Sequence, residues 1–131
     1  MLGMCVSLFS IEVNVGLCFV NVYGPYVERE RFWSNLLDIE CLKCAKLILG
    51  GDLNYSVRLS EIWGDRARLD CLSDFFTKKM EDFGLVGLVG IHPIVLLPTW
   101  SHRRVGSENI CNHLDRLLVS ADLLDLELHF Q

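Results

Sequence analysis

The segment "LILGGDLNYS", residues 47–56, passes from aliphatic residues through two glycines to a carboxylate and a carboxamide. Asp52 and Asn54 lie two positions apart just past an expected buried strand, so both side chains can point the same way. A carboxylate can orient or deprotonate water, and a carboxamide can donate a hydrogen bond to a phosphate oxygen. The same residue types are common in turns, so an Asx turn that ends the strand is the alternative interpretation.

Two further polar side chains stand out from apolar surroundings. Tyr23 ends a strand-like segment in "NVYGPY", where its phenol could hydrogen-bond a ligand or could fill the edge of the core. Asp115 lies within the apolar segment "HLDRLLVS", and a buried carboxylate is costly unless it is paired. His113 and Arg116 are neighbours that could pair with it, so a structural ion pair is the alternative to a functional role.

The segment "TWSHRRVG" combines an aromatic side chain with cations: Trp100, His102, Arg103 and Arg104. This combination suits base stacking and phosphate contact. Arginines at the tip of a turn are also ordinary solvated residues, and that interpretation stays open.

Strands are predicted where apolar residues come in short runs. Residues 5–13 and 17–23 are expected to form a hairpin, with both faces of the second strand covered. Residues 47–49 predict a short buried strand, 99–101 and 110–113 a second hairpin, and 114–119 another apolar strand.

Helices are predicted where apolar residues recur at i, i+3 and i+4, over about 28–41 and over 69–83. Residues 55–68 are expected to be a loop, and 121–124 the start of a helical turn. Helices that alternate with strands and hairpins predict a layered α/β (α+β) domain with a mixed sheet.

The composition is that of a folded chain: 131 residues, 51% hydrophobic, with a formal net charge of −5. This length suits a single domain, 1–131. Residues 1–20 are too polar for a membrane span and lack a basic leader segment, so we expect an intracellular protein of the cytoplasm or nucleus, with no membrane partner. Cys41 and Cys44 form the one C-x-x-C pair, and core cysteines are favoured over a zinc site.

The order of these motifs is more specific than any one of them. "NVYGP", then "LILGGDLN", then "PTWSHRRVGSENICNHLDRLLVS" resembles the endonuclease/exonuclease/phosphatase superfamily, and most closely the endonuclease domains of plant non-LTR retrotransposons. The resemblance covers nearly the whole chain from about Met4. It implies a deoxyribonuclease I-like fold, a two-sheet β-sandwich flanked by helices, of which this chain would be a fragment.

The resemblance also implies roles. Asp52 would activate the attacking water and bind Mg²⁺, and Asn54 would bind the scissile phosphate. Tyr23 would contact that phosphate or help at the metal, and Asp115 would orient a catalytic histidine. The hairpin at 99–113 would contact DNA or RNA through four side chains: Trp100, His102, Arg103 and Arg104.

The chain departs from the family pattern at both ends. The family domain has a strand that ends in a metal-ligating glutamate and, at its end, a Ser-Asp-His segment. Glu12 and His129 do not stand in those contexts. His113 also stands where the retrotransposon proteins of the resembled family usually have an arginine or a lysine.

Two functions are therefore expected. The first is a truncated metal-dependent phosphodiesterase of endonuclease type, weak or inactive as this chain. The second is a non-catalytic remnant that binds nucleic acid or protein, or self-associates through exposed sheet edges.

Overall fold

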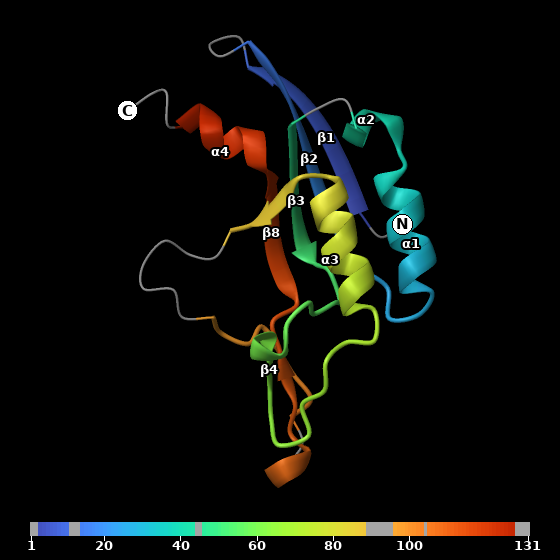
Figure 1. Ribbon diagram of the computed structural model, residues 1–131, viewed down its shortest axis with the longest axis vertical. Coiled ribbons are helices and arrows are strands. Elements are labelled where there is room, and N and C mark those ends of the chain that lie inside the picture. The colour runs from blue at the N-terminus through green and yellow to red at the C-terminus, as the bar shows by residue number, and fades with distance from the viewer. Residues whose placement is uncertain (1–2, 11–13, 44–45, 89–95, 104, 128–131) are drawn as a thin grey trace.

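A five-stranded mixed sheet forms the centre of the computed structural model, which describes residues 3–10, 14–43, 46–88, 96–103 and 105–127 (Figure 1). Its strands, in spatial order, are β1 (Gly3–Ser10), β2 (Val15–Val22), β3 (Lys46–Asp52), β8 (Asp115–Ser120) and β5 (Leu85–Gly87). Only β2 and β3 run parallel, and the other neighbours are antiparallel. β3 confirms the strand predicted at 47–49 but is longer than expected. β5 is an additional strand at one edge of the sheet.

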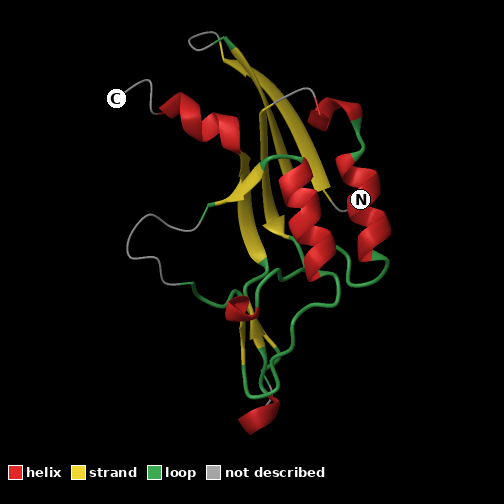
Figure 2. Ribbon diagram, in the orientation of Figure 1, coloured by secondary structure: helices red, strands yellow, loops and turns green. Residues whose placement is uncertain are grey.

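Three helices pack on one face of this sheet (Figure 2): α1 (Arg29–Leu37), α2 (Glu40–Lys43) and α3 (Ser73–Asp82). Trp33 and Phe76 are buried between the helices and the sheet, with ring centroids 6.3 Å apart in an edge-on arrangement. The apolar stripe of α3 confirms the helix predicted there. The single helix predicted over 28–41 is wrong, because the chain leaves the helix at Asp38 and starts again at Glu40.

A second, three-stranded sheet lies beyond one end of the first (Figure 1). Its strand order is β4 (Ile62–Trp63), β7 (Cys111–Asn112) and β6 (Trp100–Ser101), so the predicted hairpin at 99–113 forms with a third strand beside it. The loop predicted over 55–68 is wrong in part, because it contains β4 and a short 3₁₀ turn, Leu59–Glu61. A second 3₁₀ turn, Gly106–Glu108, lies near the hairpin tip, and α4 (Ala121–Glu127) follows β8. Two sheets with flanking helices confirm the predicted α/β class.

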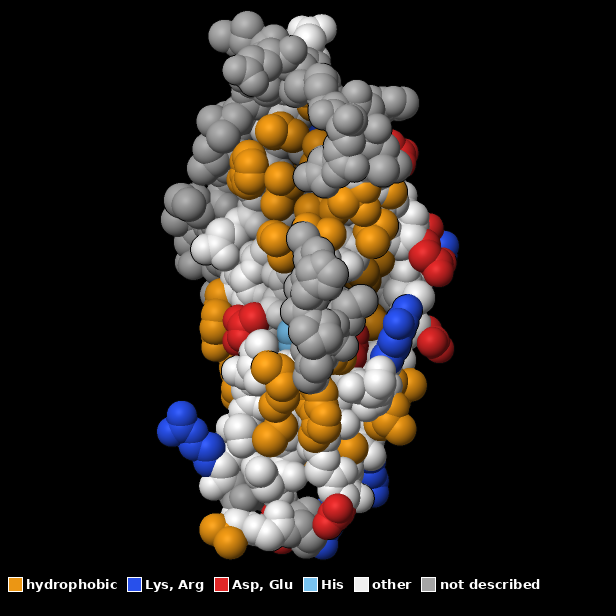
Figure 3. Space-filling model, turned by 90° about the vertical axis from the view of Figure 1, so that its left-hand side faces the viewer, with side chains coloured by type: hydrophobic (Ala, Val, Ile, Leu, Met, Phe, Trp, Pro, Cys, Tyr) orange, Lys and Arg blue, Asp and Glu red, His pale blue; other side chains and the backbone are white. Residues whose placement is uncertain are grey.

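The face of the large sheet opposite α1 and α3 is only partly covered. In β2, Cys18, Val20 and Val22 face the helices, whereas Phe19 on the other face is 36% exposed. On this second face, Leu117 of β8 is 45% exposed and Val86 of β5 is 41% exposed. The expectation that both faces of β2 are covered is therefore wrong for the described residues. Figure 3 shows hydrophobic side chains over the upper half of one side of the molecule and a further group below its middle.

None of the helices in the described ranges has the length and apolar character needed to cross a membrane.

Candidate functional site

Two glycines bring the ends of β2 and β3 together. Gly51 has φ +124°, and a Cβ placed on it would lie 2.1 Å from the Val22 carbonyl oxygen. A Cβ on Gly24 would lie 2.3 Å from the Leu53 carbonyl oxygen. Only glycine permits such approaches. The Gly24 N–H then donates to the Asp52 carbonyl at 2.7 Å, which fixes the two strand ends beside each other.

Asp52 stands at the end of β3, directly across from Asp115 in the β3–β8 pairing. One oxygen of its carboxylate accepts a hydrogen bond from the Asn54 N–H at 3.1 Å, so the predicted Asx turn is confirmed. Partial burial raises the pKa of Asp52, and the Asp115 charge raises it further against the opposing Asn54 hydrogen bond. A cation between the strand ends would relieve both effects.

Asn54 is buried, 5% exposed, and adopts a positive φ of 52°. Its side-chain nitrogen donates to the Gly24 carbonyl, which fixes the orientation of the amide. Its side-chain oxygen is buried and has no hydrogen-bond partner among the described residues. A buried acceptor without a partner is costly and rare, so this oxygen is available to a ligand or a water molecule.

Tyr23 is half-exposed at the end of β2. Its hydroxyl lies 3.5 Å from the hydroxyl of Tyr26. That contact raises the pKa of Tyr26, with smaller contributions that include the charge of Asp52. The sequence-predicted residues Tyr23, Asp52, Asn54 and Asp115 therefore meet where β2 and β3 end and β8 begins, and we call them the strand-end site.

Asp115 lies at the surface rather than buried in an apolar strand. The Thr99 hydroxyl accepts hydrogen bonds from the Leu114 and Asp115 N–H groups at 2.9 and 3.0 Å, which fixes the start of β8. The alternative of an Asp115–Arg116 ion pair is wrong, because Arg116 binds Glu61. The His113 Nδ1–H donates a hydrogen bond to the Leu97 carbonyl at 2.7 Å.

Arg116 and Glu61 join the two sheets. The guanidinium makes a bidentate ion pair with the Glu61 carboxylate at 3.0 and 2.6 Å, and both side chains are 9% exposed. The same guanidinium lies 5.0 Å from the centre of the Tyr55 ring. Burial raises the pKa of Tyr55 to about 12. Burial acts to raise the pKa of Glu61, but the hydrogen bonds and charge of Arg116, together with the Val57 and Arg58 N–H groups, outweigh burial and the pKa is lowered.

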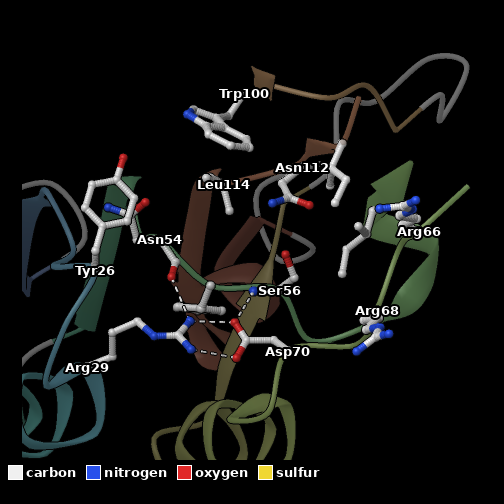
Figure 4. Close-up of a pocket in the computed structure, with 13 residues that line it drawn as sticks. Tyr26, Arg29, Asn54, Ser56, Arg66, Arg68, Asp70, Trp100, Asn112 and Leu114 are labelled. Carbon is white, nitrogen blue, oxygen red and sulfur yellow. Dashed lines mark hydrogen bonds and ion pairs between the residues drawn. The ribbon is translucent and has the colours of Figure 1, made fainter. Parts of the chain in front are cut away.

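A pocket of about 420 Å³ adjoins the strand-end site (Figure 4). Asn54 belongs to both. At the base of the pocket, Arg29 makes a bidentate ion pair with Asp70 at 2.5 and 2.8 Å. Burial acts to raise the pKa of Asp70, but the hydrogen bond and charge of Arg29, together with the Leu72 and Ser56 N–H groups, outweigh burial and the pKa is lowered.

Sequence reasoning missed most of this pocket. Its other polar lining includes Tyr26, Arg66, Arg68 and Asn112, none of which was a candidate. The R-x-R spacing of Arg66 and Arg68 was a usable signal, because alternate residues of an extended segment point the same way.

The 99–113 hairpin presents its aromatic side chain to the pocket. Trp100 lines it, and the Trp100 and His102 rings lie 5.2 Å apart. Arg103 is exposed and has φ +54°, with its N–H donating to the Ser101 hydroxyl at 3.1 Å. Arg104 lies outside the described residues, so its predicted role rests on sequence alone.

In the part of the chain that the structure describes, no three His, Cys, Asp or Glu side chains gather as a metal site. Among the described residues, Cys18, Cys71 and Cys111 are not in disulfide bonds. Cys44 of the C-x-x-C pair lies outside the described residues.

The sequence matches no protein-family model and no curated protein. Among solved structures, the fold is similar to the "Endonuclease domain of TRAS1, a telomere-specific non-LTR retrotransposon", with a TM-score of 0.67 and 18% sequence identity. The similarity covers 95% of this chain and 53% of that chain, so this chain spans about half the length of the solved domain. It confirms the predicted deoxyribonuclease I-like fold and its likeness to a retrotransposon endonuclease domain.

Proposed function

We propose that this chain carries part of a metal-dependent phosphodiesterase site of endonuclease type, which acts on DNA or RNA. The observation that supports it most is the strand-end site. Its four polar side chains come from three separate segments of the chain, and two of them are carboxylates on directly paired positions of β3 and β8. Two carboxylates side by side repel each other, which is unfavourable for folding, and such arrangements are common at functional sites.

Each side chain has a role that its geometry permits. One Asp52 oxygen is committed to the Asx turn, which leaves the other to orient a water molecule. The Asn54 amide nitrogen uses one proton on the Gly24 carbonyl and retains a second for a phosphate oxygen. The Tyr23 side chain is half-exposed at the end of β2, and its hydroxyl would donate to the same phosphate. Asp115 would orient a catalytic histidine.

The donor set fits Mg²⁺ only weakly. Mg²⁺ is commonly bound by one or two carboxylates together with water and substrate phosphates. Asp52 would hold it, with Asp115 nearby, and the ion would polarise the phosphate oxygens. The raised pKa of Asp52 is consistent with such a site, because a bound cation would favour the ionised carboxylate.

We further propose that the chain is weak or inactive by itself. The glutamate strand and the Ser-Asp-His segment of the resembled family have no counterpart in its sequence, and residues that act as a unit fail together. The closer resemblance to plant retrotransposons and the intracellular location stay predictions.

Plasmid nicking tests this proposal. At millimolar Mg²⁺, the 131-residue chain should nick supercoiled DNA no faster than its Asp52→Ala variant. A chain extended to include a glutamate strand and a Ser-Asp-His segment should nick it, and Asp52→Ala should abolish that activity. Activity that the extended chain retains after Asp52→Ala would refute the assigned site. Robust Asp52-dependent nicking by the 131-residue chain would refute its inactivity.

A second candidate function is supported by the open face of the large sheet. Phe19, Val86 and Leu117 expose apolar surface there, and β1 and β5 are edge strands. Exposed apolar patches and unpaired edges favour association. A non-catalytic chain that binds nucleic acid or protein, or that self-associates, would use this face. Sedimentation would show a concentration-dependent increase in mass that an edge-strand charge substitution such as Val86→Lys reduces.

A further inference from the structure

Two residues that line the pocket beside the strand-end site each carry a buried side-chain oxygen without a hydrogen-bond partner among the described residues. Four buried side-chain polar atoms lack a partner among the described residues, and the side-chain oxygens of Asn54 and Asn112 are two of them. Both residues line this one pocket. Buried polar atoms are rarely left unpaired in proteins, so their concentration here indicates a ligand that supplies donors.

The pocket is neutral at its base and aromatic on one side. The Arg29 guanidinium and the Asp70 carboxylate neutralise each other at the base. Trp100 lies across from that ion pair in Figure 4. A neutral base and an aromatic wall suit a planar, uncharged ring better than a phosphate group.

The cationic side chains of the pocket that have no ion-pair partner among the described residues lie away from its base and belong to Arg66 and Arg68. Arg66 and Arg68 are exposed there, and neither has an ion-pair partner within the described ranges (Figure 4). Unpaired exposed arginines beside a neutral pocket suit the phosphate of a nucleotide whose ring lies inside.

We propose that this pocket holds one unstacked nucleotide and selects a nucleobase with an exocyclic amino group, with Asn112 as a specificity-determining residue. Adenine and cytosine each offer an amino group to an unpaired carbonyl oxygen. Thymine and uracil present carbonyl oxygens at the corresponding position, which repel the two acceptors. The ring stacks on Trp100, and Arg66 and Arg68 contact its phosphate.

This inference rests on the proposed function, because Asn54 joins the pocket to the strand-end site. A nucleotide in the pocket would therefore flank the phosphate held near Asp52. Asn54 is a poor residue for testing the pocket, since its amide also holds the Gly24 carbonyl and its substitution would disturb both regions.

Binding of single-stranded homopolymers tests the proposal. The whole chain is titrated, without metal and at low salt, against labelled oligo-dA, oligo-dC and oligo-dT of equal length. We expect oligo-dA and oligo-dC to bind about tenfold more tightly than oligo-dT, because hydrogen bonds to the correct base edge give discrimination of about this size. Asn112→Leu, which has the same branching but no hydrogen-bonding groups, should bring the three affinities within about twofold of each other. Asn112→Ser is the second variant if the leucine variant does not fold.

The arginines should behave differently. Arg66→Ala and Arg68→Ala should weaken all three oligonucleotides equally and reduce the salt slope by about one unit each. Arg31→Ala, an exposed arginine of α1, is the matched control and should change neither. Competition by free deoxyadenosine monophosphate identifies the source: displacement shows that a free nucleotide suffices, and its absence shows that a strand is required.

Three results would overturn the inference: equal affinity for the three homopolymers, a base preference that survives Asn112→Leu and Asn112→Ser, or no oligonucleotide binding. Equal affinities would leave the proposed function standing, because a strand-end site that binds phosphates has no base preference. The nicking experiment tests that function separately.

Discussion

Gly51→Ala is expected to lower the free energy of unfolding by at least about 3 kcal/mol, enough to leave much of the chain unfolded. Gly51 adopts φ +124°, a conformation that side chains rarely adopt, and its Cβ would lie 2.1 Å from the Val22 carbonyl oxygen. That oxygen belongs to the backbone, so the clash cannot be relieved by rotation of a side chain. Chemical denaturation followed by circular dichroism measures the loss.

Gly50→Ala is the matched control. Gly50 lies outside the left-handed region, and its Cβ would meet a Leu117 side-chain carbon at 3.2 Å and the Arg116 carbonyl oxygen at 3.3 Å. The leucine can move by a few tenths of an ångström, so we expect a loss of about 1 kcal/mol. Equal losses at the two glycines would contradict the claim that the close approach of β2 and β3 requires glycine at position 51.

Arg116→Met is expected to cost about 3 kcal/mol, because it leaves the Glu61 carboxylate buried without its partner. Both side chains of this pair are 9% exposed. The exposed Lys78–Asp82 pair of α3 provides the control, and Lys78→Met should cost less than about 1 kcal/mol. Arg116→Met/Glu61→Leu should recover much of the loss, since a hydrophobic pair can replace a buried ion pair. Equal effects of Arg116→Met and Lys78→Met would contradict this account.

The pH dependence gives an independent measure of the same pair. The pKa of Glu61 in the folded protein is below its ordinary value of 4.5, so the pair stabilises the fold above that pH. That stability is lost as the pH falls through the lowered pKa. In Arg116→Met, burial without a cation would raise the pKa of Glu61, so acidification should stabilise the variant. Denaturation midpoints between neutral pH and pH about 3 distinguish the two slopes.

Much of the site could be predicted because the position of a residue along a strand determines where its side chain lies on the sheet. Asp52 and Asn54 end a buried run, Tyr23 ends another, and Asp115 begins a third, and strand ends share an edge when the strands pair. The turn at the Gly-Gly-Asp-Leu-Asn segment could also be predicted, because glycine, Asp and Asn are common in sharp turns. The roles of these side chains in chemistry remain predictions.

The pocket could not be predicted in the same way. Asn112, Arg66 and Asp70 come together only because β4 pairs with β7 in a second sheet, and strands of two residues carry too little periodicity to be recognised. Likewise, the partner of Arg116 is Glu61, 55 positions away, whereas sequence reasoning could only consider its neighbours. Exposure of Phe19 also depends on what packs over the sheet, which an alternating pattern does not specify.

The most direct test of the strand-end site is an amide-resolved NMR titration of the chain with a short single-stranded oligonucleotide, with and without Mg²⁺. We predict that Mg²⁺ adds shifts at Gly24, Asp52, Asn54 and Asp115 once the oligonucleotide is bound. In Asp52→Ala these Mg²⁺-dependent shifts should disappear. Shifts confined to α1, α3 or α4, or Mg²⁺-dependent shifts that persist in Asp52→Ala, would contradict the claim that these four residues form a phosphodiester site.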